Sequence, residues 1–174
     1  MANSNYKNKF TKWASQLGLC FIASVGPVNA EGLEKLTQQD LRCLIQNGYF
    51  EARSDGYASV MGVTNVVLNR TADPRYPNTI CGVVYQGRQD SNGNMLRNQC
   101  QFSWYCDGKS DRMTNQELRD KVQIVVHETL ALWYNNIDIT EGATHYHANY
   151  VRPTWAKTLN YTTQIGTHKY YRWN

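Results

Sequence analysis

The sequence predicts a single, mainly helical domain of the α+β class, with a long irregular loop and one or two short strands. The chain has 174 residues, of which 41% are apolar and 18% charged, as expected of one globular domain with a substantial core. Three stretches repeat apolar residues at helical spacing. Residues 72–111 lack this period and are interrupted by Gly and Pro, so we expect a long surface loop there.

The three helices are expected near residues 37–52, 57–69 and 114–133. Thr37 with Asp40, and Thr114 with Glu117, have the spacing of a capping box, in which each side chain bonds the other residue's backbone N–H. Asp55 precedes the second helix and is expected to cap it.

Residues 1–36 are expected to form a separate N-terminal segment, and residues 37–174 the domain. Three lysines precede a moderately apolar stretch, residues 13–28, and a small-residue site follows, which is the layout of a secretory signal. Polar residues interrupt that stretch, and it is too short for a stable membrane span. A retained N-terminal arm that docks in a larger assembly is the alternative, and we favour the arm.

The aromatic content and the net charge indicate which kinds of molecule the protein binds. Aromatic residues make up 12% of the chain and gather in its last segment, residues 142–173. Surfaces rich in Tyr and Trp suit partners with flat apolar faces and hydroxyls, such as sugars or nucleobases. The net charge of +4 favours an anionic partner, but Lys and Arg do not form the dense stripe of a nucleic-acid binder. We therefore expect no nucleic-acid partner.

Five cysteines are present, an odd number that excludes a fully paired monomer. A bridge from Cys81 to Cys100 or Cys106 would close the glycine-rich loop of a protein that works outside the cytoplasm. Buried free thiols are the alternative, which we favour.

Glu51 is the first candidate for chemistry. It lies seven residues after Leu44 and three after Gly48, so helical spacing places it beside the apolar face at the C-terminal end of the first helix. Partial desolvation and the negative end of the helix dipole both raise the pKa of a carboxyl group, as a general acid requires. An ion pair with Arg53 or Arg70 is the structural alternative.

Several stretches, in order, resemble one known family. Residues 51–70 read EARSDGYASVMGVTNVVLNR, residues 76–85 read YPNTICGVVY, and residues 101–104 read QFSW. Residues 143–148 read ATHYHA, and residues 165–171 read IGTHKYY. This order resembles the SleB-type cell-wall hydrolases, the family of the spore-cortex-lytic enzymes and related phage enzymes. Ser54 and Asp55 replace the usual Gly and Glu, which puts a role for Asp55 in doubt.

The resemblance implies a lysozyme-like fold and lytic transglycosylase chemistry with a single catalytic residue, Glu51. Protonated Glu51 donates its proton to the glycosidic oxygen between N-acetylmuramic acid and N-acetylglucosamine. The resulting carboxylate then takes the proton of the muramic C6 hydroxyl, which closes a 1,6-anhydro ring without consuming water. No cofactor or metal is implied, and the expected partner is the peptidoglycan glycan strand, whose carboxylates suit a mildly basic groove.

The same resemblance, together with residue type, suggests groups that contact the sugars or orient Glu51. We expect Gln101 and Ser103 to bond sugar polar groups, Tyr146 to bond Glu51 or stabilise developing charge, and His147 and Trp155 to line the groove. The expected place of action is the cell wall or periplasm, for an exported or virion-associated enzyme.

Three alternatives remain. Asp55 as a second carboxylate would permit hydrolysis with water, as in a muramidase. His145 and His147 project to one side if they lie on a strand, as ligands of a metal-dependent amidase can. In the third alternative, the chain would be a non-enzymatic module that holds peptidoglycan within a virion. Its N-terminal arm would then bind other virion proteins.

Overall fold

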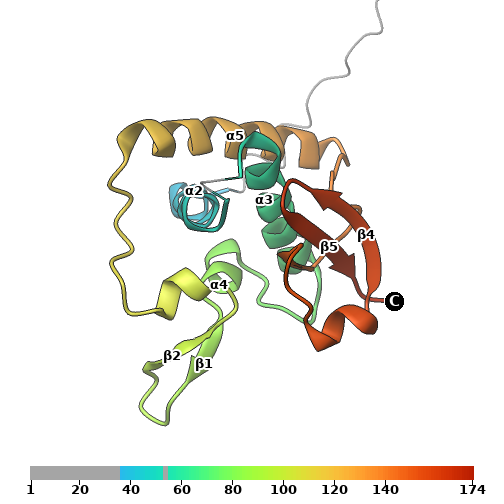
Figure 1. The fold of residues 1–174 in the computed structure, drawn as a ribbon. Coiled ribbons are helices and arrows are strands. Elements are labelled where there is room, and N and C mark those ends of the chain that lie inside the picture. Colours follow the sequence, from blue (N-terminus) through green and yellow to red (C-terminus); the bar gives the residue numbers. More distant parts are fainter. Residues whose placement is uncertain (1–35, 53–54) are drawn as a thin grey trace, which may run out of the picture.

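The structure, a computed structural model, describes residues 36–52 and 55–174 (Figure 1). The segment expected as a signal peptide or retained arm therefore lies outside the described residues, except for Leu36. None of the helices in the described ranges is long and apolar enough to span a bilayer.

Helix α3, Tyr57–Ala72, is the central helix of the domain, and every residue from Ser59 to Arg70 is buried. It packs against α2 (Gln38–Ala52), α5 (Gln116–Tyr134) and the short α4 (Ile80–Val84). In Figure 1, α5 crosses above α2 and α3, while strands β4 and β5 stand on the other side of α3. The three expected helices are confirmed.

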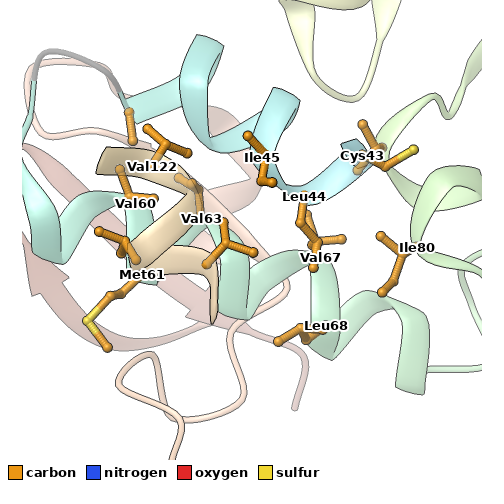
Figure 2. Close-up of a cluster of buried hydrophobic side chains, with 14 of the residues drawn as sticks. Cys43, Leu44, Ile45, Val60, Met61, Val63, Val67, Leu68, Ile80 and Val122 are labelled. Carbon is orange, nitrogen blue, oxygen red and sulfur yellow. The ribbon is translucent and has the colours of Figure 1, made fainter. Parts of the chain in front are cut away.

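The core forms where these helices meet (Figure 2). Apolar residues on one side of α2 face valines of α3, as their helical spacing predicted. The buried side chains drawn there include Leu44 and Ile45 of α2, Val60, Val63 and Val67 of α3, Ile80 of α4 and Val122 of α5.

One of the two expected capping boxes is present. The Thr37 backbone N–H donates to Asp40 Oδ2 (3.1 Å), and the Asp40 N–H donates to Thr37 Oγ1 (3.0 Å). The second box is wrong, because α5 begins at Gln116 and Asn115 is its cap, accepting from the Leu118 N–H at 2.9 Å. Asn caps a helix as well as Thr does.

Asp55 does not cap α3. The N-cap residue is Gly56, which has a φ of 83° and makes no side-chain capping bond. That expectation is therefore wrong, and the Asp55 carboxylate has other partners, described below.

The expected loop at residues 72–111 is largely ordered structure. It contains α4, a hairpin of β1 (Gly87–Gln89) and β2 (Met95–Cys100), and the 3-10 helix η1 (Ser103–Cys106). The turn of the hairpin forms because Asp90 Oδ1 accepts from the backbone N–H groups of Asn92 and Asn94 at 2.9 and 2.8 Å.

Two disulfides hold this region, and one of them joins it to helix α2. Cys43–Cys81 joins α2 to α4, and Cys100–Cys106 joins the end of β2 to η1. Both expectations are corrected, because Cys81 pairs with neither Cys100 nor Cys106, and these four cysteines are not free thiols. Cys43 and Cys81 meet through the packing of α2 against α4, which sequence spacing does not reveal.

The aromatic C-terminal segment forms a three-stranded antiparallel sheet in the order β3-β5-β4. Its strands are β3 (His145–Ala148), β4 (Asn160–Ile165) and β5 (His168–Arg172), with a 3-10 helix, η2 (Thr154–Lys157), between β3 and β4. The α+β class is confirmed, whereas the expected number of strands was too low.

Candidate active site

Glu51 and Tyr146 meet at the junction of the helices and the C-terminal sheet. Glu51 lies in the last turn of α2 and is partly buried. Tyr146 lies on β3 and donates its phenolic hydrogen to Glu51 Oε2 at 2.7 Å. The structure therefore brings these two predicted site residues into direct contact.

The surroundings of Glu51 shift its acidity in opposing directions. Burial raises the pKa of Glu51 above its ordinary value, while the Tyr146 hydrogen bond and the charge of Arg70 lower it by smaller amounts. Burial and the neighbouring Glu51 raise the pKa of Tyr146 well above 10. Tyr146 therefore keeps its proton and remains a donor, while Glu51 is suited to hold a proton and to lose it.

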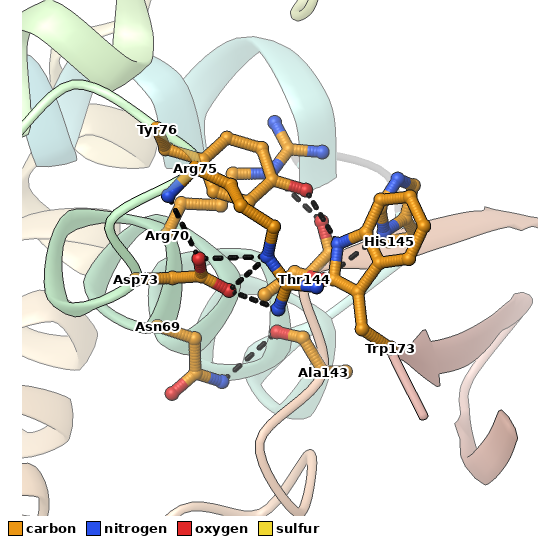
Figure 3. Close-up of polar contacts among 9 residues, drawn as sticks. All are labelled: Asn69, Arg70, Asp73, Arg75, Tyr76, Ala143, Thr144, His145 and Trp173. Carbon is orange, nitrogen blue, oxygen red and sulfur yellow. Dashed lines mark hydrogen bonds and ion pairs between the residues drawn. The ribbon is translucent and has the colours of Figure 1, made fainter. Parts of the chain in front are cut away.

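Arg70, at the end of α3, is a buried cation close to this pair. Its Nε donates to the Thr144 carbonyl at 2.7 Å, and its guanidinium lies over the rings of Tyr76 (5.3 Å) and Phe102 (5.2 Å). Figure 3 shows Arg70 between Tyr76 and Thr144, where β3 begins. An ion pair with Arg53 is outside the described residues, and Arg70 acts on Glu51 through its charge.

Asp55 is held by the turn between β4 and β5. Its Oδ2 accepts from Thr167 Oγ1 at 2.7 Å and lies 3.4 Å from His168 Nδ1, without hydrogen-bond geometry. Burial lowers the pKa of His168, with Asp55 acting in the opposite direction. The His168 ring in turn lies edge-on to Tyr146, with ring centres 5.1 Å apart. Asp55 therefore positions the turn that backs Tyr146.

A cavity of about 460 Å³ opens beside Glu51. Ser103 lines it, together with Trp104, whose indole N–H donates to Asn47 Oδ1 at 3.1 Å. Gln101 is exposed and does not line this cavity; its backbone N–H donates to Gln86 O at 2.8 Å. The structure thus brings Ser103, but not Gln101, to the cavity at Glu51.

His147 and Trp155 lie on the other side of the sheet. Side chains alternate along a strand, so His145 and His147 point away from the side that carries Tyr146. His147 stacks on Tyr171, with centres 5.2 Å apart, and Trp155 packs edge-on against His147 at 5.5 Å. The structure does not bring these two predicted groove residues to Glu51.

The two histidines on one side of β3, as expected for a His-x-His pair, face aromatic rings. Both contact Trp155, and His145 also contacts Trp173. Burial, followed by the charges of Arg70 and Arg75, lowers the pKa of His145 to about 4. In the described part of the chain, His, Cys, Asp and Glu form no group of three or more that would hold a metal ion.

Sequence reasoning missed the charged rim of the cavity. The cavity is also lined by four charged residues of the segment that begins just after η1, namely Asp107, Lys109, Asp111 and Arg112. The run of charged residues around Gly108 was the available signal, but spacing alone does not show that the segment folds toward α2. Arg70 was noted only as an ion-pair partner, because its burial depends on Tyr76 and Phe102.

Comparison with known proteins finds one family. A family model described as Cell Wall Hydrolase matches residues 54–171, a range that begins just after Glu51. The chain is 27% identical over 106 residues to a spore cortex-lytic enzyme of Bacillus subtilis, and 33% identical over 52 residues to one of Bacillus cereus. These matches cover 59% and 30% of this chain, but only 31% and 20% of the relatives.

Two solved structures share the fold. The catalytic domain of the germination-specific lytic transglycosylase SleB from Bacillus anthracis superposes with a TM-score of 0.60 at 24% identity, over 79% of this chain and 98% of that one. The catalytic domain of Bacillus cereus SleB gives a TM-score of 0.59 at 23% identity, over 78% and 91%. At these identities the likeness establishes the fold.

Proposed function

Because the chain belongs to the cell wall hydrolase family, we propose that it cleaves peptidoglycan glycan strands as a lytic transglycosylase, with Glu51 as its single acid and base. The observation that supports this most directly is the hydrogen bond from Tyr146 to a partly buried Glu51 with a raised pKa, at the wall of a cavity. These are the properties of a carboxyl group that exchanges a proton with a bound sugar.

The two proton transfers follow from this environment. Burial favours protonated Glu51, which donates its proton to the oxygen between N-acetylmuramic acid and N-acetylglucosamine as that bond breaks. An oxocarbenium-like muramic centre and a carboxylate result. Tyr146 and Arg70 both stabilise this carboxylate. Glu51 then accepts the proton of the muramic C6 hydroxyl, whose oxygen bonds to C1, so Glu51 returns to its starting form.

The position of Asp55 argues against its use as a second catalytic carboxylate. A hydrolase that activates water needs a second carboxylate facing the sugar. Asp55 is instead bonded to Thr167 and lies against His168 at the β4–β5 turn. We therefore assign Asp55 to the support of the turn, and we propose the sugar's own C6 hydroxyl as the nucleophile of the closing step.

We also infer that the enzyme works outside the reducing cytoplasm, at the cell wall. Its two disulfides form and persist in oxidising surroundings. Either an exported enzyme or a virion-associated one fits this inference, with an N-terminal arm contacting other virion proteins in the second case.

The test is mass spectrometry of purified peptidoglycan digested by the wild type, by Glu51→Gln and by Glu128→Gln. Glu128 is exposed on α5, so the third protein controls for the same substitution away from the site. We expect anhydro-muramic products from the wild type and Glu128→Gln, and a rate about 10²- to 10⁴-fold lower for Glu51→Gln.

Other products would contradict the proposal in distinct ways. Reducing muramic ends would show hydrolysis and would make Asp55→Asn the next variant. Free stem peptides would show an amidase. No products from any protein would indicate a binding or structural role.

A further inference from the structure

The outer side of the C-terminal sheet carries a cluster of rings that the chemistry at Glu51 does not use. We call it the outer aromatic face, and it consists of His145, His147, Trp155, Tyr161, Tyr171 and Trp173. The opposite side of the same sheet packs on α3, where Tyr170 is fully buried with Val66.

Part of this face is a small core and part is open. Tyr171 is only 7% exposed, because His147, Trp155 and Tyr161 surround it at centre distances of 5.2 to 5.6 Å. Tyr161 and Trp173, by contrast, are 55% and 41% exposed. Packing of the sheet accounts for Tyr171 but not for two large rings left in solvent at its margins.

The open rings have polar edges and cationic neighbours. Arg75 lies over the Trp173 ring at 4.7 Å, and the Trp173 N–H donates to the Tyr76 hydroxyl at 3.4 Å (Figure 3). Lys169 is paired in register with His147, so it projects from the same side of the sheet.

The charge of this part of the chain has one sign. Residues 142–174 contain four Lys or Arg and no Asp or Glu. Asp73, which acts on His145 from outside this segment, is held by Arg75 through an ion pair. An anionic partner therefore meets no free carboxylate among the residues of this face.

We propose that the outer aromatic face is a second binding surface for polymeric peptidoglycan, on the side of the sheet opposite Tyr146. Flat rings with polar edges stack on sugar rings, and the acid-free basic segment complements the carboxylates of lactyl ethers and stem peptides. The choice of peptidoglycan as the ligand of this face rests on the proposed function, because peptidoglycan is also the proposed substrate at Glu51. Its role is to hold the enzyme on the insoluble wall while Glu51 acts on a strand.

The experiment measures binding without cleavage. Glu51→Gln serves as the parent, and its co-sedimentation with purified insoluble peptidoglycan is compared with that of three further variants in the same background: Tyr161→Ala, Trp173→Ala and Lys169→Glu. Tyr57→Ala is the matched control, because Tyr57 is a 52% exposed tyrosine at the start of α3. Thermal melts establish that each variant is folded.

We expect the dissociation constant to rise about 2- to 10-fold for each aromatic variant, in line with the worth of one ring contact. We expect Lys169→Glu to weaken binding at low salt and to reduce its salt dependence. Tyr57→Ala binds as the parent does. Unchanged binding by all three variants, equal loss in Tyr57→Ala, or no binding by the parent would each overturn the inference. Because no products are measured, these results are distinct from a failure of the transglycosylase proposal.

Discussion

At the scale of single residues, the balance around Glu51 decides the chemistry. Burial raises its pKa, while Tyr146 and Arg70 limit the rise. A carboxyl group with too high a pKa would donate its proton to the glycosidic oxygen poorly, and one with too low a pKa would not recover a proton from the C6 hydroxyl. Burial therefore favours the step in which Glu51 takes up a proton, and Tyr146 and Arg70 favour the step in which Glu51 releases one.

Tyr146→Phe removes the hydrogen bond that favours ionised Glu51. We expect the pKa of Glu51 to rise further, because that bond lowers it in the wild type. Activity falls as Glu51 ionises, and we expect this fall to occur at higher pH in the variant. We also expect the maximal rate to be about tenfold lower, as for the loss of a hydrogen bond to a charged group. If the rate of Tyr146→Phe falls over the same pH range as that of the wild type, Tyr146 does not lower the pKa of Glu51.

Glu51→Gln should make the protein more stable at neutral pH. Because the folded-state pKa of Glu51 is raised, its favourable contribution is complete below the unfolded pKa and is lost as pH rises through the folded pKa. Gln escapes that loss and still offers an oxygen to Tyr146. We expect Tm at pH 7 to rise by about 2–4 °C, the equivalent of ~1 kcal/mol in a domain of this size. The difference should shrink below pH 4.5; a constant difference across pH would argue against a raised pKa.

At the scale of elements, the close packing of α3 against the sheet sets the position of Tyr146. Gly62 on α3 faces Tyr170 on β5, and a Cβ added at residue 62 would lie 2.8 Å from Tyr170 Cζ. The Tyr170 ring lies 5.7 Å from that of Tyr146. Only glycine allows this approach of the sheet to the helix.

Gly62→Ala should therefore destabilise the domain by about 1–3 kcal/mol through overpacking. Chemical denaturation measures this change, with Ala58→Ser on the exposed side of α3 as the control. We also expect lower activity, because Tyr170 would push against Tyr146. A stable and fully active Gly62→Ala would show that the sheet adjusts freely on α3.

The elements that the sequence predicted correctly are those determined by residues close together in the chain. The three helices follow from apolar spacing, and the Thr37–Asp40 box from four adjacent residues. The hairpin at Asp90 and the cap at Asn115 also have local signals, which were outweighed by glycine content and by the Thr114–Glu117 spacing. The pairing of β3 with β5 joins residues far apart in the sequence, so the sheet was not predicted.

The candidate site shows the same division. Glu51 follows from its place on α2, and Tyr146 from the family resemblance. His147 and Trp155 lie across the sheet from Glu51 because of the way β3 is oriented relative to α3. The spacing of His145 and His147 in the sequence does not define that orientation.

At the scale of the whole molecule, one disulfide attaches α4 to α2, the helix that carries Glu51, and a second joins the end of the hairpin to η1. Cys43–Cys81 closes a loop with a sequence separation of 38, and Cys100–Cys106 one of 6. Loop entropy then assigns about 4 kcal/mol to the first bridge and about 2 kcal/mol to the second.

Thermal melts of Cys43→Ala/Cys81→Ala and of Cys100→Ala/Cys106→Ala check this order. We expect the larger fall in Tm for the first pair, which also loses packing at the buried Cys43. A larger fall for the second pair would show that attachment of η1, not of α4, dominates the stability of the fold.

The central claim is that Glu51 performs both proton transfers and that no water enters the product. Digestion of peptidoglycan in ¹⁸O-labelled water by the wild type and by Glu51→Gln, followed by mass spectrometry, tests it most directly. The account predicts muramic products without ¹⁸O, lighter by one water than reducing ends, from the wild type and almost none from Glu51→Gln. Incorporation of ¹⁸O at the muramic C1 position, or unchanged cleavage by Glu51→Gln, would contradict it.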